Sequence, residues 1–94
     1  MFKPLDPLLH SELRLAIMAL LSNVEEADFI YIKEQTNATA GNLSVQIEKL
    51  QKAGYIKVEK GFVGKKTRTT CSILPNGTAA MMAYVEALKT YLPK

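Results

Sequence analysis

Apolar residues recur at helical spacing in three stretches of the chain. The first follows Ser11, whose side chain can accept the first free N–H groups of a helix. Four apolar side chains there return on one helical face, and they are Leu13, Ile17, Leu20 and Leu21. The pattern predicts a helix over residues 11–22 with this face buried.

The second stretch contains two helices in succession. Asp28 can cap a short helix of about two turns, and Thr39 can cap a longer helix over residues 40–53 that Gly54 ends. Between them, Asn37 tolerates left-handed backbone. Two helices are therefore expected to meet across a tight turn. The longer one has a buried face of Leu43, Ile47 and Leu50.

The hydrophobic period then changes from helical to alternating. Residues 55–60 alternate apolar and charged side chains, which predicts a strand with one wet face. Residues 61–66 form a glycine-bracketed connection with a basic tip, and the threonine-rich residues 67–74 return as the second strand of a hairpin. Phe29, upstream, is expected to form a minimal strand or a hydrophobic staple.

The two ends of the chain have different patterns. Residues 1–10 contain two prolines and predict an extended arm that packs on the body or on a second subunit. Residues 75–92 are the third helical stretch, and Pro75 fits the first turn of a helix. The apolar stripe of this helix consists of Met81, Tyr84, Val85, Leu88, Tyr91 and Leu92.

Length and composition favour one globular module over residues 1–94. The chain has 94 residues, of which 48% are hydrophobic, too few for two independent cores. No run approaches the roughly eighteen apolar residues of a membrane span, and residues 1–4 do not open a signal peptide. The expected location is therefore the cytoplasm, with no membrane partner.

Metal, redox and catalytic chemistry lack candidate residues. Cys71 is the single cysteine and His10 the single histidine, so neither a disulfide within the chain nor a structural zinc site is expected. No nucleophile and base stand at a plausible spacing. We expect no cofactor, no metal and no enzymatic activity.

Positive charge is concentrated in one third of the chain. The net charge is only +3, but residues 40–70 carry seven basic and two acidic side chains, a net +5. The remaining residues carry five basic and seven acidic side chains, a net −2. Such a segment suits the neutralisation of nucleic-acid phosphates, although a solvated lysine face has the same composition.

Helix, helix, tight turn, helix and basic hairpin form the order of a winged helix-turn-helix. Several segments resemble, in order and spacing, a bacterial family of winged-helix regulators close to the MarR and ArsR types. They are Leu5–Ser11, Arg14–Leu21, Asp28–Phe29 with Tyr31, Gly41–Ser44, Ala53–Ile56 before Val58–Lys60, Gly61–Phe62, Arg68–Thr69 and Gly77.

The resemblance implies an α+β fold and a cytoplasmic transcriptional regulator. The expected order is helix, short strand, two helices, two strands and a last helix. Members of the family bind double-stranded DNA as homodimers that meet through their terminal helices. One departure is Leu74, which stands where such proteins tend to have Thr or Ser, so Pro75 must organise the start of the last helix.

The helix over residues 40–53 is the expected recognition helix, because its width fits the major groove. Gln46 suits a bidentate contact to adenine, and Val45 suits a thymine methyl group. Short polar residues near the helix start can hold phosphate. The candidates are Asn42, Ser44, Val45, Gln46 and Lys49. The alternative is that they only cap and solvate the helix.

The hairpin connection, residues 61–68, is the expected wing. Lys65 and Lys66 suit phosphates, and Arg68 suits a minor groove. The alternative is a hairpin that charge merely keeps in solution.

The last helix has more apolar residues than one buried face of a small domain needs. We expect it to form a homodimer with the arm, bringing together Leu5, Leu8, Met81, Tyr84, Val85, Leu88, Tyr91 and Leu92. The competing hypothesis is a protein-interaction module without a specific DNA target. A small-molecule effector at the dimer seam stays open, but no residue pattern supports it.

Overall fold

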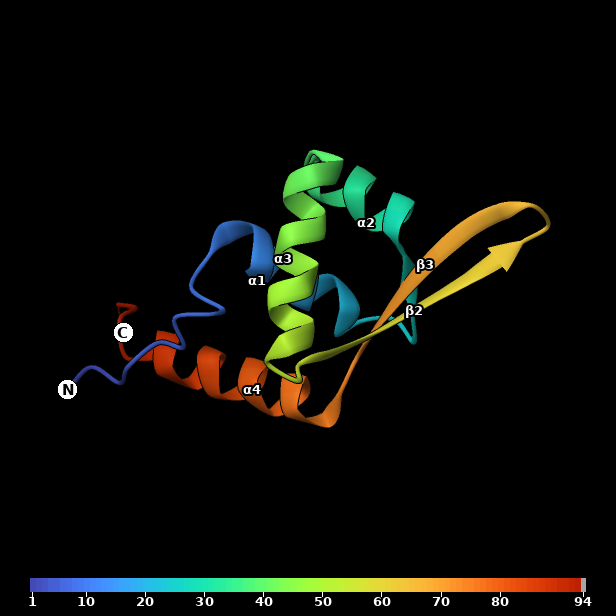
Figure 1. Ribbon diagram of the computed structural model, residues 1–94. Helices are drawn as coiled ribbons and strands as arrows, with labels where there is room; N and C mark the ends of the chain where they lie inside the picture. The colour runs from blue at the N-terminus through green and yellow to red at the C-terminus, as the bar shows by residue number, and fades with distance from the viewer. Residues whose placement is uncertain (94) are drawn as a thin grey trace.

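The fold is a winged helix with four helices and three strands. A computed structural model describes residues 1–93 of the chain (Figure 1). Its elements, in order, are α1 (Glu12–Leu21), β1 (Ala27–Asp28), α2 (Phe29–Thr36), α3 (Ala40–Lys52), β2 (Ile56–Val63), β3 (Lys66–Ile73) and α4 (Pro75–Lys89). This is the predicted α+β order. The last helix ends three residues before the expected boundary.

Side-chain caps explain where the first three helices begin. Ser11, Asp28 and Thr39 each have extended backbone, and each side chain accepts a hydrogen bond from the backbone N–H three residues further on. Such caps each contribute about 1 kcal/mol to helix stability. All three were predicted. Because Asp28 is the cap and Phe29 the first residue of α2, the minimal strand lies at Ala27–Asp28 and not at Phe29.

The start of α4 and the turn after α2 depend on backbone geometry. Leu74 gives α4 no side-chain cap, and Pro75 stands in its first turn, as the departure from the family pattern implied. Asn37 ends α2 with a φ of 55°, the left-handed conformation expected for it. The short turn brings α2 and α3 together as a helix-turn-helix.

The hairpin is longer than the sequence pattern indicated. β2 pairs with β3 from Ile56 opposite Ile73 to Val63 opposite Lys66, and β1 adds a third strand on the far side of β3. The predicted connection over residues 61–66 is therefore wrong: Gly61 and Phe62 continue the ladder. The actual turn is Gly64–Lys65, with Gly64 at a φ of 64° and Lys65 not at positive φ, as in a type II′ turn.

One hydrophobic core collects side chains from the helices, the inner ends of the strands and the arm. Burial of each large aliphatic side chain contributes about 1.5–3 kcal/mol. The side chains that are essentially inaccessible are Leu9, Ile17, Met18, Leu21, Ile32, Leu43, Leu50, Ile56 and Cys71. Cys71 serves here as a small apolar residue of β3.

The N-terminal arm is attached to the body at several points. Tyr55 donates a 2.6 Å hydrogen bond from its hydroxyl to the Asp6 carboxylate. Farther out, the Tyr91 hydroxyl donates to the Lys3 carbonyl at 2.8 Å, and the Phe2 and Tyr91 rings stack with centroids 4.7 Å apart. The arm therefore packs against the residues that follow α4.

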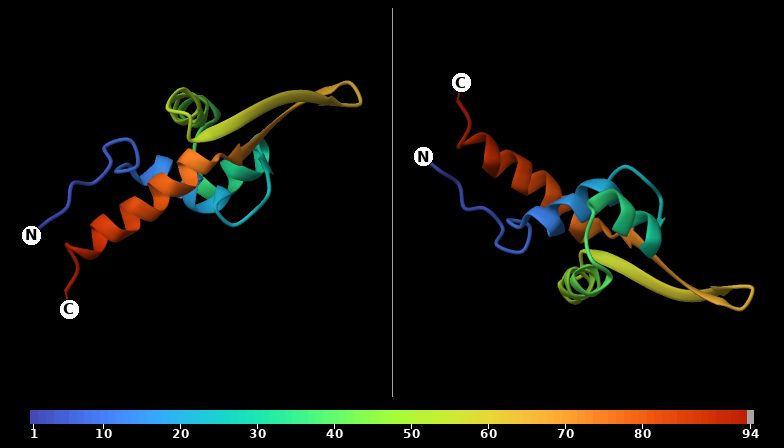
Figure 2. Two further views of the ribbon diagram at one scale, coloured as in Figure 1. Left: turned by 90° about the horizontal axis from the view of Figure 1, so that it is seen from below. Right: turned by 90° about the horizontal axis from the view of Figure 1, so that it is seen from above.

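The molecule is elongated, with extents of 54 × 25 × 21 Å. Figure 1 shows the hairpin at one end and both termini at the other. In the two views of Figure 2, α3 is seen end-on and lies on the same side of the molecule as the hairpin. No helix within residues 1–93 is both long and apolar enough to cross a membrane.

Candidate nucleic-acid interface

The outward face of α3 carries most of the side chains expected to read DNA. Leu43, Ile47 and Leu50 hold the helix against the core. The opposite side is in water, and Val45 is 49% exposed there although it is apolar. The other exposed candidates are Asn42, Ser44 and Lys49.

Gln46 differs from its neighbours because it is half-buried and hydrogen-bonded. Its Oε1 accepts from the Arg14 guanidinium of α1, and its Nε2 donates to the Asn42 Oδ1 at 3.0 Å. Arg14 also donates from Nε to the Leu8 carbonyl at 2.6 Å. Sequence reasoning missed Arg14, and its separation of 32 positions from Gln46 left no local signal for this contact.

An open groove separates α3 from the hairpin. It encloses about 570 Å³ between α3, β2 and β3, with Phe29 at one side. Its remaining lining consists of Ser44, Ile47, Glu48, Gln51, Val58, Lys60 and Thr69. Five of its eight lining residues are polar or charged, so the groove is not a typical apolar ligand pocket.

The outer half of the hairpin projects into water, and every side chain from residue 59 to residue 68 is exposed. Lys65 lies in the turn and Lys66 beside it, as expected of a wing tip. The sequence interpretation overlooked Phe62 and Val63, which are 75% and 61% exposed. Their sequence signal was present, but they were assigned to an irregular connection.

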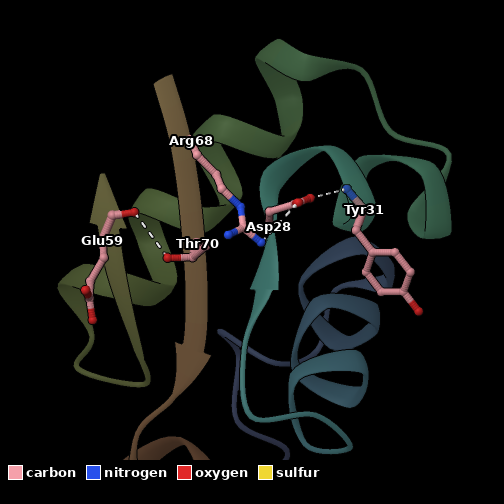
Figure 3. A network of polar contacts seen from close by, with 5 residues as sticks. All are labelled: Asp28, Tyr31, Glu59, Arg68 and Thr70. Carbon is pink, nitrogen blue, oxygen red and sulfur yellow. Dashed lines mark hydrogen bonds and ion pairs between the residues drawn. The ribbon is translucent and has the colours of Figure 1, made fainter. Parts of the chain in front are cut away.

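Arg68 is not at the tip of the wing but faces the body. Its guanidinium lies 3.6 Å from the Asp28 carboxylate, which also caps α2 by accepting from the Tyr31 N–H at 2.8 Å (Figure 3). On the other side of β3, Thr70 donates to the Glu59 carbonyl at 3.5 Å. The ion pair joins the hairpin to the start of α2.

Several basic groups on this side of the molecule have no acidic partner. Lys52 pairs with Glu48 at 3.0 Å, and Lys57 pairs with Glu59 at 2.8 Å, a contact that raises the pKa of Lys57. Within residues 1–93, the basic residues of the +5 segment without an ion-pair partner are Lys49, Lys60, Lys65 and Lys66. They keep their positive charge available to an anion.

The residues expected at a dimer interface divide into three groups. Tyr84 is buried in its own chain, with its hydroxyl hydrogen-bonded to the His10 ring at 3.1 Å, so its side chain is not offered to a second copy. Leu5, Leu8, Met81 and Leu88 are half-buried against the core. The exposed ones are Val85, Tyr91 and Leu92, to which the structure adds Met82 at 67% exposure.

Neither the cysteine nor the acidic residues form a reactive or metal-binding cluster in the described part of the chain. Burial raises the pKa of the Cys71 thiol from 9.0 to about 11, which keeps it protonated at neutral pH. No group of three or more His, Cys, Asp or Glu side chains within residues 1–93 is arranged to hold a metal ion.

The comparisons with known proteins agree with this geometry. A family model described as a winged helix DNA-binding domain matches residues 13–92. An uncharacterised protein of the archaeon Methanocaldococcus jannaschii is 33% identical over 76 residues, which cover 81% of this chain and 83% of that protein.

Solved structures with the same fold include regulators from archaea and bacteria. A transcriptional regulator homologue from Pyrococcus horikoshii superposes with a TM-score of 0.81 at 28% identity, covering 89% of this chain and 83% of that one. Bacillus subtilis PadR in complex with operator DNA gives 0.71 at 17% identity, covering 82% and 48%. The resemblance therefore extends beyond bacterial regulators.

Proposed function

The chain belongs to the family of winged-helix DNA-binding domains, a family of transcriptional regulators and not of enzymes, and we propose that it binds a specific sequence in double-stranded DNA as a homodimer. The observation that carries this proposal is that α3 and the hairpin lie on the same side of the molecule (Figure 2), and that both carry lysines without an ion-pair partner within residues 1–93. Binding to double-stranded DNA implies that the protein acts in the cytoplasm.

In the proposed complex, α3 enters the major groove and the wing lies on the backbone or in the minor groove. A helix about 10–12 Å wide fits the major groove of B-DNA. Val45 meets a thymine methyl group, and Lys49 meets a base or phosphate. Because Thr39 accepts from the Asn42 N–H, the N–H groups of Ala40 and Gly41 are the ones that favour a phosphate at the start of α3. The exposed side chains of Asn42 and Ser44 follow them in the helix.

The wing lysines neutralise phosphates in this proposal, and Arg68 needs a rearrangement first. Lys65 and Lys66 are exposed. Arg68 is engaged by Asp28, but an exposed ion pair of this kind contributes only about 0–1 kcal/mol. A DNA phosphate or minor groove is thus able to draw Arg68 away from the body.

The exposed apolar side chains of α4 support the homodimer. Met82 and Val85, with Met81, line a shallow hollow of about 380 Å³ on the outer face of the helix. Tyr91 and Leu92 continue this surface toward the arm. A two-fold interface here would repeat the same surface on both subunits, with the two α3 helices about 34 Å apart, one turn of DNA.

Selection from random duplexes tests the DNA-binding half of the proposal. We expect enrichment of a palindromic site with half-sites one helical turn apart. Lys49→Ala should weaken binding and lower the salt slope by about one unit if Lys49 meets a phosphate. Lys89→Ala, which removes a charge at the far end of α4, is the control. The absence of duplex affinity at low salt would refute the proposal.

Light scattering tests the homodimer. The wild-type chain should have twice the mass of one chain without DNA, and Val85→Glu should give a folded monomer because it places a charge on the apolar face. Ala83→Glu adds the same charge at an exposed position of α4 outside the hollow, so it is the matched control and should stay dimeric.

A second candidate function uses the same exposed face of α4. If the chain is monomeric, lacks affinity for duplex DNA and pairs only with another protein, it is a winged-helix protein-interaction module. Mass and DNA affinity together therefore separate the two candidates.

A further inference from the structure

Three hydrogen bonds connect the N-terminal arm with the outward face of α3. The Leu8 carbonyl accepts from Arg14 Nε at 2.6 Å. The Arg14 guanidinium then donates to Gln46 Oε1, and Gln46 Nε2 donates to Asn42 Oδ1 at 3.0 Å. The series begins in the arm, passes through α1 and ends on α3.

The chemistry of Arg14 decides how the two amides are oriented. A guanidinium has five N–H donors and no acceptor, so the Gln46 amide can face it only with its oxygen. The Gln46 nitrogen must then point toward Asn42, which accepts with its own oxygen. As a result, both amide oxygens already accept a hydrogen bond, whereas the second N–H of Gln46 Nε2 and the Asn42 NH₂ group are unused within the series.

Partial burial makes this orientation persistent. Arg14 and Gln46 are both half-buried where α1 meets α3, and the planar fork of Arg14 is held at Nε by a backbone carbonyl. Asn42 is exposed at the outer end of the series. The amide donors therefore face the side of α3 that would enter a major groove.

We propose that Arg14 is a positioning residue that sets base specificity by holding the Gln46 and Asn42 amides as donors, so that they select guanine. This inference rests on the proposed DNA-binding function. Guanine presents two acceptors, N7 and O6, in the major groove, whereas adenine presents N7 beside an N6 amino donor. The bidentate Gln–adenine contact expected from the sequence would compete with Arg14 for the Gln46 oxygen, because the guanidinium already takes one of its two lone pairs.

The test combines Arg14→Lys with duplex selection and a modified base. Lysine keeps the charge but not the planar fork. The wild type should enrich guanine at one position of each half-site, and replacing that base by 7-deazaguanine should weaken binding about tenfold. Arg14→Lys should lose most of this discrimination and admit adenine, while its salt slope stays unchanged.

A double-mutant cycle distinguishes positioning from general support of the fold. In the Gln46→Ala background, Arg14→Lys should have no further effect on the guanine preference, whereas independent effects would add. Ala19→Ser, at an exposed position in the second half of α1, is the control for changes in that helix. Thermal melting of each variant verifies that it is folded. A purely structural role of Arg14 would weaken binding to all sequences equally and would leave the guanine preference unchanged.

Each outcome of this experiment has a separate meaning. A wild type that binds selectively without a guanine preference, or an Arg14→Lys variant that keeps the preference, refutes the positioning role and leaves the proposed function intact. A drop in salt slope in Arg14→Ala without any change in base preference identifies Arg14 as a phosphate contact instead. A wild type without duplex affinity refutes both proposals.

Discussion

At the scale of single residues, Asp28 serves two elements at once. One carboxylate oxygen caps α2, and the other lies near the Arg68 guanidinium of β3. Asn is as good a helix cap as Asp but carries no charge. Asp28→Asn should therefore preserve stability, release Arg68 and remove a negative charge from the proposed DNA-binding side.

The expected result for Asp28→Asn is severalfold tighter binding to DNA and a salt slope steeper by about one unit. Titrations of a duplex at several salt concentrations measure both. Glu26→Gln removes a charge from the exposed loop before β1 without facing Arg68, and it is the matched control. Equal effects of the two variants would mean that only net charge matters.

Among the five glycines, Gly77 leaves the least room for a side chain. A Cβ atom there would lie 2.1 Å from the Tyr55 carbonyl oxygen and 2.9 Å from Ile73 Cγ1, so α4 would have to move off the hairpin base. Gly77→Ala should lower the free energy of unfolding by about 2 kcal/mol or more. Urea denaturation measures the change.

Gly41→Ala is the control, since a Cβ at Gly41 meets nothing within 4 Å. In α3 it should be neutral or stabilising by up to about 1 kcal/mol. Comparable losses in both variants would contradict the packing argument.

The residues that sequence reasoning misplaced are those fixed by contacts between distant segments. Tyr84 was assigned to a dimer interface because its helical stripe is apolar, but His10, 74 positions earlier, provides its hydrogen-bond partner inside the chain. Gln46 was expected to contact adenine because nothing near it in the sequence indicates its contact with Arg14, 32 positions earlier. Periodicity reports which face a residue occupies, and it does not report what covers that face.

At the scale of elements, local chemistry made the helices predictable. The starts of α1, α2 and α3 follow from the caps at Ser11, Asp28 and Thr39, and the start of α4 follows from Pro75. The hairpin was less predictable because Gly61 was interpreted as a terminator. Its pairing with Arg68 continues the ladder, and only the partner strand could reveal this.

The extended hairpin makes the wing a separable element. Because Lys65 and Lys66 are exposed and have no ion-pair partner within residues 1–93, replacing both by Ala should leave the melting temperature unchanged. It should also lower the salt slope of DNA binding by about one unit for each lysine that meets a phosphate. Lys3→Ala together with Lys89→Ala, at the opposite end of the molecule, controls for total charge. An unchanged slope in the wing variant would exclude wing contacts with phosphate.

At the scale of the whole molecule, burial of Cys71 in the core should lower the free energy of unfolding at alkaline pH. The folded protein holds the Cys71 proton with a pKa of about 11, against 9.0 for an ordinary thiol. The contribution of this group is fully present below pH 9 and is lost as pH rises toward 11 and beyond. The pKa of Tyr55 is also raised, chiefly by its hydrogen bond to Asp6, and acts in the same direction.

Urea denaturation at pH 8 and at pH 10.5 measures this loss. Cys71→Ala should reduce the difference between the two pH values, and Tyr55→Phe should reduce it separately. A pH dependence identical to the wild type in Cys71→Ala would show that the thiol is not linked to folding. The buried thiol should also resist alkylation until the protein unfolds.

The exposed outer half of the hairpin has a dynamic consequence. Beyond Arg68, which pairs with Asp28, its strands are joined only by their own ladder and the Gly64 turn. A lone two-stranded hairpin is marginally stable in water. Backbone amides near the tip should exchange with deuterium far sooner than those beside Cys71, which lie over the core. In the proposed complex, a phosphate contact of the tip lysines would order this segment, so the conformational entropy lost there would offset part of the affinity that the contact adds.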